Sequence, residues 1–137
     1  MATVELLLSP LPVHVRTARL VSVAAARRAG LPDELVDELR FAVGEACSRA
    51  VALHIAHAPD TLVKVVLRDD AAGLTVEITD AGPSAEPLTG EPSIEGDDVD
   101  PQVSLAVLSG LVDDLTITPA DSGTTVALRW PLPPKAP

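Results

Sequence analysis

The sequence predicts an α/β fold: a two-layer sandwich in which helices pack on one face of a mixed, mostly antiparallel sheet. The order of segments is strand, helix, long helix, hairpin, loop, helix and hairpin, with no internal repeat. Paired β-branched runs joined by short turns indicate antiparallel hairpins. The stretches between them space their apolar residues every three or four positions, as amphipathic helices do. Such helices bury their apolar stripe against a sheet, which indicates a helical layer on one sheet face.

Length and composition are typical of one domain. The chain has 137 residues, 47% of them hydrophobic, which is enough for a single core. We expect one domain over residues 1–131 and a proline-rich C-terminal tail over 132–137. Phe41 and Trp130 are the only aromatic residues. The interior is therefore expected to be filled by Ala, Val and Leu.

The first half of the chain predicts a strand and two helices. A β-branched and leucine run, Thr3–Leu8, ends at a proline turn. An amphipathic helix over Val13–Arg28 should end at Gly30, a residue suited to a left-handed C-cap. Its apolar positions are Val13, Ala18, Val21, Ala24 and Ala25. Pro32, followed by two acids, marks the start of a long helix that ends at about His57.

The second half predicts two hairpins separated by a loop and a short helix. The expected strands are Leu62–Arg68, Leu74–Thr79, Leu115–Thr118 and Thr124–Trp130, and the helix is Val103–Val112. The segment 81–101 contains four prolines, three glycines and six acids without a base. An insert of this kind is either a functional lid or a disordered segment. Both interpretations of this acidic loop remain open.

Charge and cysteine content exclude several classes of function. The net charge of −10 repels phosphate backbones and anionic membranes, so we expect neither nucleic-acid nor membrane binding. An acidic surface instead suits basic protein partners. Without a leader sequence or an apolar span, and with Cys47 as its single cysteine, the chain is expected to be cytoplasmic. Cys47 itself is expected to be a buried small hydrophobe.

Histidine spacing predicts no metal site. His14, His54 and His57 lack carboxylates at ligand spacing, and for such residues a surface or helix-cap role is more frequent than metal ligation. We therefore assign no metal ligand among them.

Four short motifs follow one another along the chain. The long helix contains FAVGEACSRA with Glu45 and Arg49, and EITDAGP supplies Asp80 and Gly82. QVSLAVLSGLVD contains Leu105, and GTTV begins at Gly123. In order and context these motifs resemble those of the RsbW/SpoIIAB-like anti-sigma factors, which are serine kinases of the GHKL (Bergerat-fold) ATPase superfamily. The resemblance extends from the first strand to Trp130.

The resemblance implies a histidine-kinase-type ATPase fold and a site for ATP or ADP with Mg²⁺. Glu45 matches the general base that activates the hydroxyl group of the protein substrate. Asp80 matches the acceptor of the adenine amino group, and Gly82 lets the backbone approach the base. Leu105, Gly123 and Thr125 match the remaining nucleotide-binding motifs.

The chain departs from the family at several of these positions. Arg49 replaces the magnesium-binding Asn, and arginine has only donors. Ser84, Gln102 and Ser104 replace motif glycines. We therefore expect the nucleotide site to be weakened or lost, and we assign no metal ligand. The residues of this site are Arg49, Asp80, Gly82, Leu105, Gly123 and Thr125.

Simpler interpretations of the same residues remain open. Glu45 and Arg49 are spaced for an i,i+4 ion pair on one helix face, worth about 0.2–0.5 kcal/mol. Asp80 followed by Gly82 is, in isolation, typical of a turn at the end of a strand.

As a function, the resemblance implies an anti-sigma-type partner-switching regulator that binds a sigma factor and an anti-anti-sigma antagonist, and that commonly forms a homodimer. Two alternatives stay open: an active ATP-dependent serine kinase that phosphorylates the antagonist, and a non-catalytic dimerising scaffold.

Overall fold

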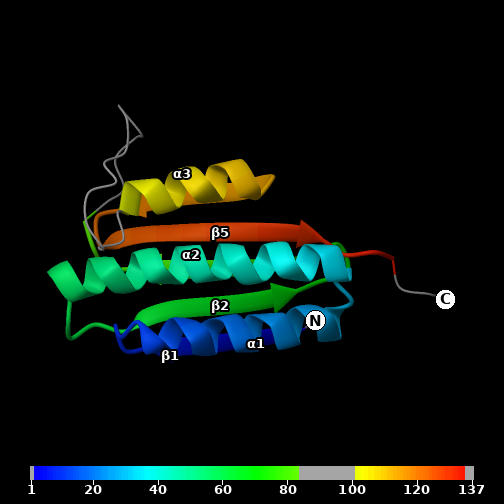
Figure 1. Ribbon diagram of the computed structural model, residues 1–137, viewed down its shortest axis with the longest axis horizontal. Coiled ribbons are helices and arrows are strands. Elements are labelled where there is room, and N and C mark those ends of the chain that lie inside the picture. The colour runs from blue at the N-terminus through cyan, green and yellow to red at the C-terminus, as the bar shows by residue number, and fades with distance from the viewer. Residues whose placement is uncertain (1, 84–100, 135–137) are drawn as a thin grey trace.

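Five strands form one sheet and the helices cover one of its faces (Figure 1). The structure, a computed structural model, describes residues 2–83 and 101–134. Its elements are β1 (Thr3–Leu8), α1 (Val13–Ala29), α2 (Asp33–His57), β2 (Val63–Asp69), β3 (Gly73–Asp80), α3 (Pro101–Leu111), β4 (Asp114–Ala120) and β5 (Gly123–Pro131). The strand order is β1-β2-β3-β5-β4. The predicted α/β sandwich is confirmed, and every strand pairing in the described residues is antiparallel.

The two long helices begin and end at the residues that the sequence singled out. Gly30 adopts φ 94°, and its N–H donates to the carbonyl groups of the last turn of α1, as a left-handed C-cap does. Pro32 precedes α2, whose first turn carries Asp33 and Glu34 near the positive end of the helix dipole. The buried face of α1 differs from the expected apolar set: it consists of Val15, Ala18, Ser22, Val23 and Ala26.

The two faces of the sheet differ in polarity because side chains alternate along each strand. In β3, residues 74, 76, 78 and 80 are buried beneath the helices, whereas Thr75, Glu77 and Thr79 face away. The core is aliphatic, as expected, with Trp130 as its one aromatic residue among the described residues. The Trp130 indole N–H donates to Glu38 Oε2 at 2.7 Å and so ties β5 to α2.

Both ends of the described chain lie at the β2–β3 turn. The Ala2 N–H donates to Asp69 Oδ1 at 2.7 Å, and the Leu132 N–H donates to the Ala72 carbonyl group at 3.2 Å. Figure 1 shows the start of β1 and the end of β5 on the same side, while β3 ends and β5 begins at the opposite end of the sheet. That opposite end carries Asp80.

The predicted acidic loop and tail are described only at their margins. Of the segment 81–101, residues 81–83 follow β3, and Pro101 already belongs to α3. Residues 84–100, and 135–137 of the tail, lie outside the described residues.

Candidate functional site

A buried ion pair joins two of the predicted site residues. Arg49 Nη1 donates to Asp80 Oδ2 at 2.8 Å, and the two residues are 2% and 3% exposed. The second carboxylate oxygen, Asp80 Oδ1, accepts the Gly82 backbone N–H at 3.0 Å. Arg49 thus pairs across the helix–sheet interface with Asp80 and not with Glu45 on its own helix, so the i,i+4 ion-pair interpretation was wrong.

The local fold explains why these two side chains meet. Asp80 is the last residue of β3 and lies on the strand face that packs against the helices. Arg49 lies on the buried face of α2, as Ala46 and Ala50 do. Breaking a buried pair by removing one partner typically costs about 3–5 kcal/mol, because a charge remains uncompensated. The pair is therefore part of the α2–β3 interface.

His54 holds the turn that follows Asp80. The ring is fully buried, Nε2 accepts the Ala81 N–H at 2.8 Å, and Nδ1 lies 2.8 Å from the Thr61 carbonyl oxygen. Since a backbone N–H only donates and a carbonyl only accepts, Nε2 carries no proton and Nδ1 carries one. The contacts therefore select a single neutral tautomer. Sequence reasoning placed this histidine at the surface or at a helix cap, and the structure corrects this.

The two threonines of the GTTV motif, at the start of β5, lie on opposite faces of the sheet. Gly123 has φ 145°, and a Cβ atom there would lie 1.8 Å from the Asp80 carbonyl oxygen, so the close approach of β5 to β3 requires glycine. Asp80 is paired in register with Thr124, which is buried. Thr125 lies on the opposite sheet face, where its hydroxyl is 3.0 Å from that of Thr79. Thr125 is thus not brought together with Asp80, and sequence reasoning missed Thr124.

The two remaining predicted residues lie on the helices. Glu45 is half-buried on α2, one turn before Arg49. Leu105 is buried in α3, which packs against α2. Ser104, beside it, is also buried, so a hydroxyl group stands where the motif has a glycine.

Comparison with models of protein families shows to which family the chain belongs. A family model of the histidine kinase-like ATPase domain matches residues 8–130. The chain belongs to this family. No curated protein matches it.

The histidine kinase-like ATPase domain is also similar to a solved structure. That structure contains the RsbU and RsbW domains of a Mycobacterium tuberculosis protein, with a TM-score of 0.72 and 17% sequence identity. The match covers 98% of this chain and 34% of that one, so the domain spans about a third of its length. At this identity the likeness shows the fold.

The family implies an adenine nucleotide, but the residues present do not fit one bound in the family's manner. Both oxygens of Asp80, the residue that matches the adenine acceptor, already accept hydrogen bonds, and the carboxylate is buried. Arg49 stands at the position that matches the magnesium ligand, and its guanidinium cannot ligate a cation. Among residues 2–83 and 101–134, no group of three or more His, Cys, Asp or Glu residues is placed to hold a metal ion.

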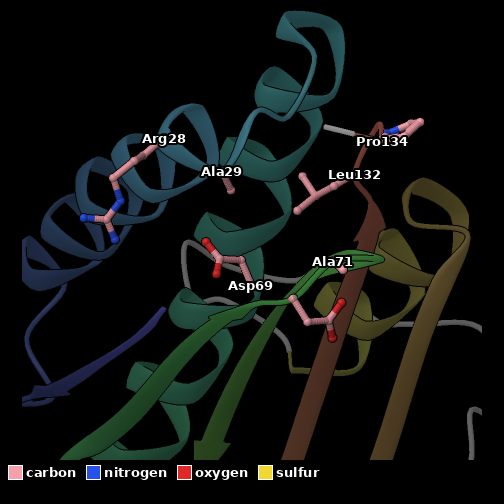
Figure 2. Close-up of a pocket in the computed structure, with 7 residues that line it drawn as sticks. Arg28, Ala29, Asp69, Ala71, Leu132 and Pro134 are labelled. Atoms are coloured by element: carbon pink, nitrogen blue, oxygen red, sulfur yellow. The ribbon is translucent and has the colours of Figure 1, made fainter. Parts of the chain in front are cut away.

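A separate cleft lies at the opposite end of the sheet from Asp80. It has a volume of about 510 Å³ and lies between Arg28 of α1, the β2–β3 turn and Leu132 (Figure 2). Its two acidic residues, Asp69 and Asp70, both have structural partners. Asp69 Oδ1 accepts the Ala2 N–H, and the N–H groups of Ala72 and Gly73 hold the pKa of Asp70 below its ordinary value. We assign no ligand to this cleft.

Two further findings bear on chemistry and location. Burial raises the pKa of the Cys47 thiol to about 12, against a smaller opposing effect of Arg19, so this thiol stays protonated and inert near neutral pH. In the described part of the chain, no helix is both long and apolar enough to cross a membrane.

Proposed function

We propose that this domain is a partner-switching regulator of transcription of the anti-sigma type, which binds a sigma factor, an anti-anti-sigma antagonist or both. The motif order supports the proposal, as does the fold shared with a structure that contains an RsbW domain. A protein-binding role needs a surface that suits a protein partner. The outer face of α1 has the properties of one.

The observation that carries the proposal is the charge of α1. This helix contains Arg16, Arg19, Arg27 and Arg28 and no acidic residue, in a chain with a net charge of −10. All four arginines are exposed, and none forms an ion pair within the described residues. The Arg19 guanidinium lies against Gly44 of α2. The other three arginines are exposed and unpaired within the described residues, and are therefore available to a partner.

Apolar side chains lie among these arginines. We call Val13, Arg16, Leu20, Ala24 and Arg27 the α1 outer stripe, because their spacing puts them on one face of the helix and all are exposed. Val13 is 65% exposed and Leu20 is 63% exposed. Apolar anchors flanked by arginine are typical of protein interfaces. The stripe fits an acidic amphipathic helix of a partner, while the acidic remainder of the surface disfavours nucleic acid.

Binding of purified sigma factors and antagonist proteins from the source organism tests the proposal. Biolayer interferometry with the wild-type chain should detect at least one of them at micromolar affinity or tighter. The double variant Arg16→Glu with Arg27→Glu should weaken that binding at least tenfold. Arg40→Glu, an exposed arginine on α2, is the control and should have little effect.

Two results would contradict the proposal. The first is that no sigma factor or antagonist binds. The second is that a partner binds and the stripe variant retains wild-type affinity, which would exclude α1 as the docking surface. A homodimer remains a prediction, which light scattering at several concentrations would test.

The proposed function is binding of protein partners and includes no catalytic step. A serine kinase with Glu45 as general base would need an adenine acceptor and a cation ligand, and the Arg49–Asp80 pair supplies neither. The residues that match nucleotide-binding motifs lie around the Asp80 end of the sheet, and none of them is on α1. Nucleotide binding can therefore be tested separately from partner binding, with substitutions that leave α1 unchanged.

A further inference from the structure

We propose that the outer edge of β1 binds an extended segment of a partner protein, which pairs with β1 as an additional antiparallel strand. The groove between β1 and α1 receives the apolar side chains of this segment, and Arg28 receives a carboxylate group. Of the residues that line the groove, only Ala24 also belongs to the α1 outer stripe. The inference therefore concerns a second surface and does not depend on which protein the stripe binds.

β1 is an edge strand whose outer edge is not blocked. It lies at the end of the strand order and pairs with β2, so no described strand occupies its other edge. In an antiparallel pair, alternate residues direct their N–H and C=O groups away from the partner strand. Natural edge strands are commonly protected by proline, lysine or a bulge. The other edge strand, β4, contains Pro119, whereas Thr3–Leu8 contains neither proline nor lysine and pairs with β2 in continuous register.

The helical layer leaves β1 partly uncovered. The inward side chains of Val4 and Leu6 are half-buried, whereas their register neighbours on β2, Leu67 and Val65, are 2% and 0% exposed. Beside Val4, a groove with a volume of about 280 Å³ lies between β1 and α1. An added strand would cover Val4 and Leu6 as their neighbours on β2 are covered. The residues of α1 that line the groove are Val21, Ala24, Ala25 and Arg28.

Charges around the groove indicate the chemistry of the occupant. Arg28 is exposed and lines the groove together with Val4, and it forms no ion pair within the described residues. Glu5, on the opposite face of β1, is also exposed and has no ion-pair partner there. A carboxylate therefore fits Arg28, and a basic side chain fits Glu5. A second copy fits less well, because it would bring two α1 helices, each with four arginines and no acid, to one junction.

The register predicts the sequence pattern of the segment. Side chains alternate between the two faces, so apolar residues belong beside Val4 and Leu6, with a basic residue between them beside Glu5. Every strand pairing in the described residues is antiparallel, and an added antiparallel strand runs toward the start of β1. The next inward position, beside Ala2, is the one for an acid that reaches Arg28. The pattern is thus apolar, basic, apolar, any residue, acid.

Two synthetic peptides with blocked ends test the proposal. VTVKVTE has the predicted pattern, and VTVKVTK is its matched control. In a titration followed by NMR, VTVKVTE should bind the wild-type chain with Kd of about 100 μM or tighter. VTVKVTK should bind about fivefold more weakly, because it loses the ion pair with Arg28. Arg28→Glu should reverse this preference, whereas Arg27→Glu, on the α1 outer stripe, should not.

Amide hydrogen exchange distinguishes strand addition from other modes of binding. Main-chain hydrogen bonds to the added strand should slow exchange of the alternate N–H groups of β1 that do not donate to β2. The corresponding N–H groups at the free edge of β4 should exchange at an unchanged rate, which makes β4 the internal control.

Four results would overturn the proposal. The first is that VTVKVTE does not bind at about 1 mM. The second is binding that leaves the exchange of β1 unchanged. The third is equal binding of both peptides, with no reversal by Arg28→Glu. The fourth is a dimer, detected by light scattering, in which the outer N–H groups of β1 are protected without peptide, because a second copy would then occupy the edge.

Discussion

Replacing Gly123 by Ala tests whether the glycine of the GTTV motif serves backbone packing. An alanine Cβ there would lie 1.8 Å from the Asp80 carbonyl oxygen and 2.9 Å from Ala81 Cα, and both are backbone atoms that cannot rotate away. The φ of 145° is also unfavourable for any residue with a Cβ. Backbone strain costs about 1–3 kcal/mol and overpacking about the same, so we expect a loss of about 2–6 kcal/mol.

The expected change is large enough to measure by thermal unfolding. For a chain of 137 residues, 1 kcal/mol corresponds to about 3.5 °C in Tm, so Gly123→Ala should lower Tm by about 7–20 °C. The fluorescence of Trp130, the single tryptophan and 2% exposed, reports unfolding directly. Gly110→Ala in α3 is the matched control: its Cβ meets nothing within 4 Å, so it should stabilise the helix by about 0.5–1 kcal/mol.

A small effect would refute the reasoning. If Gly123→Ala unfolds within about 1 kcal/mol of the wild type, β5 does not approach the Asp80 backbone closely enough to require glycine. That result would refute the claim that Gly123 is required for backbone packing. It would also refute the claim that the Gly123 backbone packs closely against the Asp80 carbonyl group.

Three further changes have defined outcomes. A maleimide should not label Cys47 in the folded protein at pH 8, and stability should fall as pH rises above 9, because the unfolded thiol ionises near its ordinary pKa of 9.0 while the folded one does so at about 12. His54→Leu removes the ring acceptor of the Ala81 N–H and should cost about 1–3 kcal/mol in urea unfolding. Trp130→Phe removes the N–H that binds Glu38 and should cost about 1–3 kcal/mol, measured by circular dichroism.

Local signals predicted the helices well. Gly30 marks the C-terminal end of α1 and Pro32 marks the start of α2. Both residues act through their own backbone preferences, which do not depend on tertiary contacts. The buried face of α1 was predicted less well: Ala24 is exposed and Ser22 is buried. Alanine and serine differ too little in size and polarity for spacing alone to assign their side of a helix.

The site depends on contacts that are distant in the sequence. Arg49 and Asp80 are 31 positions apart, and nearer partners such as Glu45 satisfy the same spacing rules. Which threonine of GTTV faces the helices depends on the register of β5 against β3, and a shift of one residue reverses it. The burial of His54 likewise depends on Ala81 and Thr61, which only the folded chain brings to it.

The position of the chain ends has a consequence for fusions. Ala2 is hydrogen-bonded to Asp69 and Leu132 to Ala72, so both ends leave the domain beside the same turn. A second domain attached at either end would therefore begin beside the β2–β3 turn, away from the end of the sheet at which Asp80 lies. For the same reason a short linker could join the two ends, and a circularly permuted chain could be opened elsewhere without moving the Arg49–Asp80 pair.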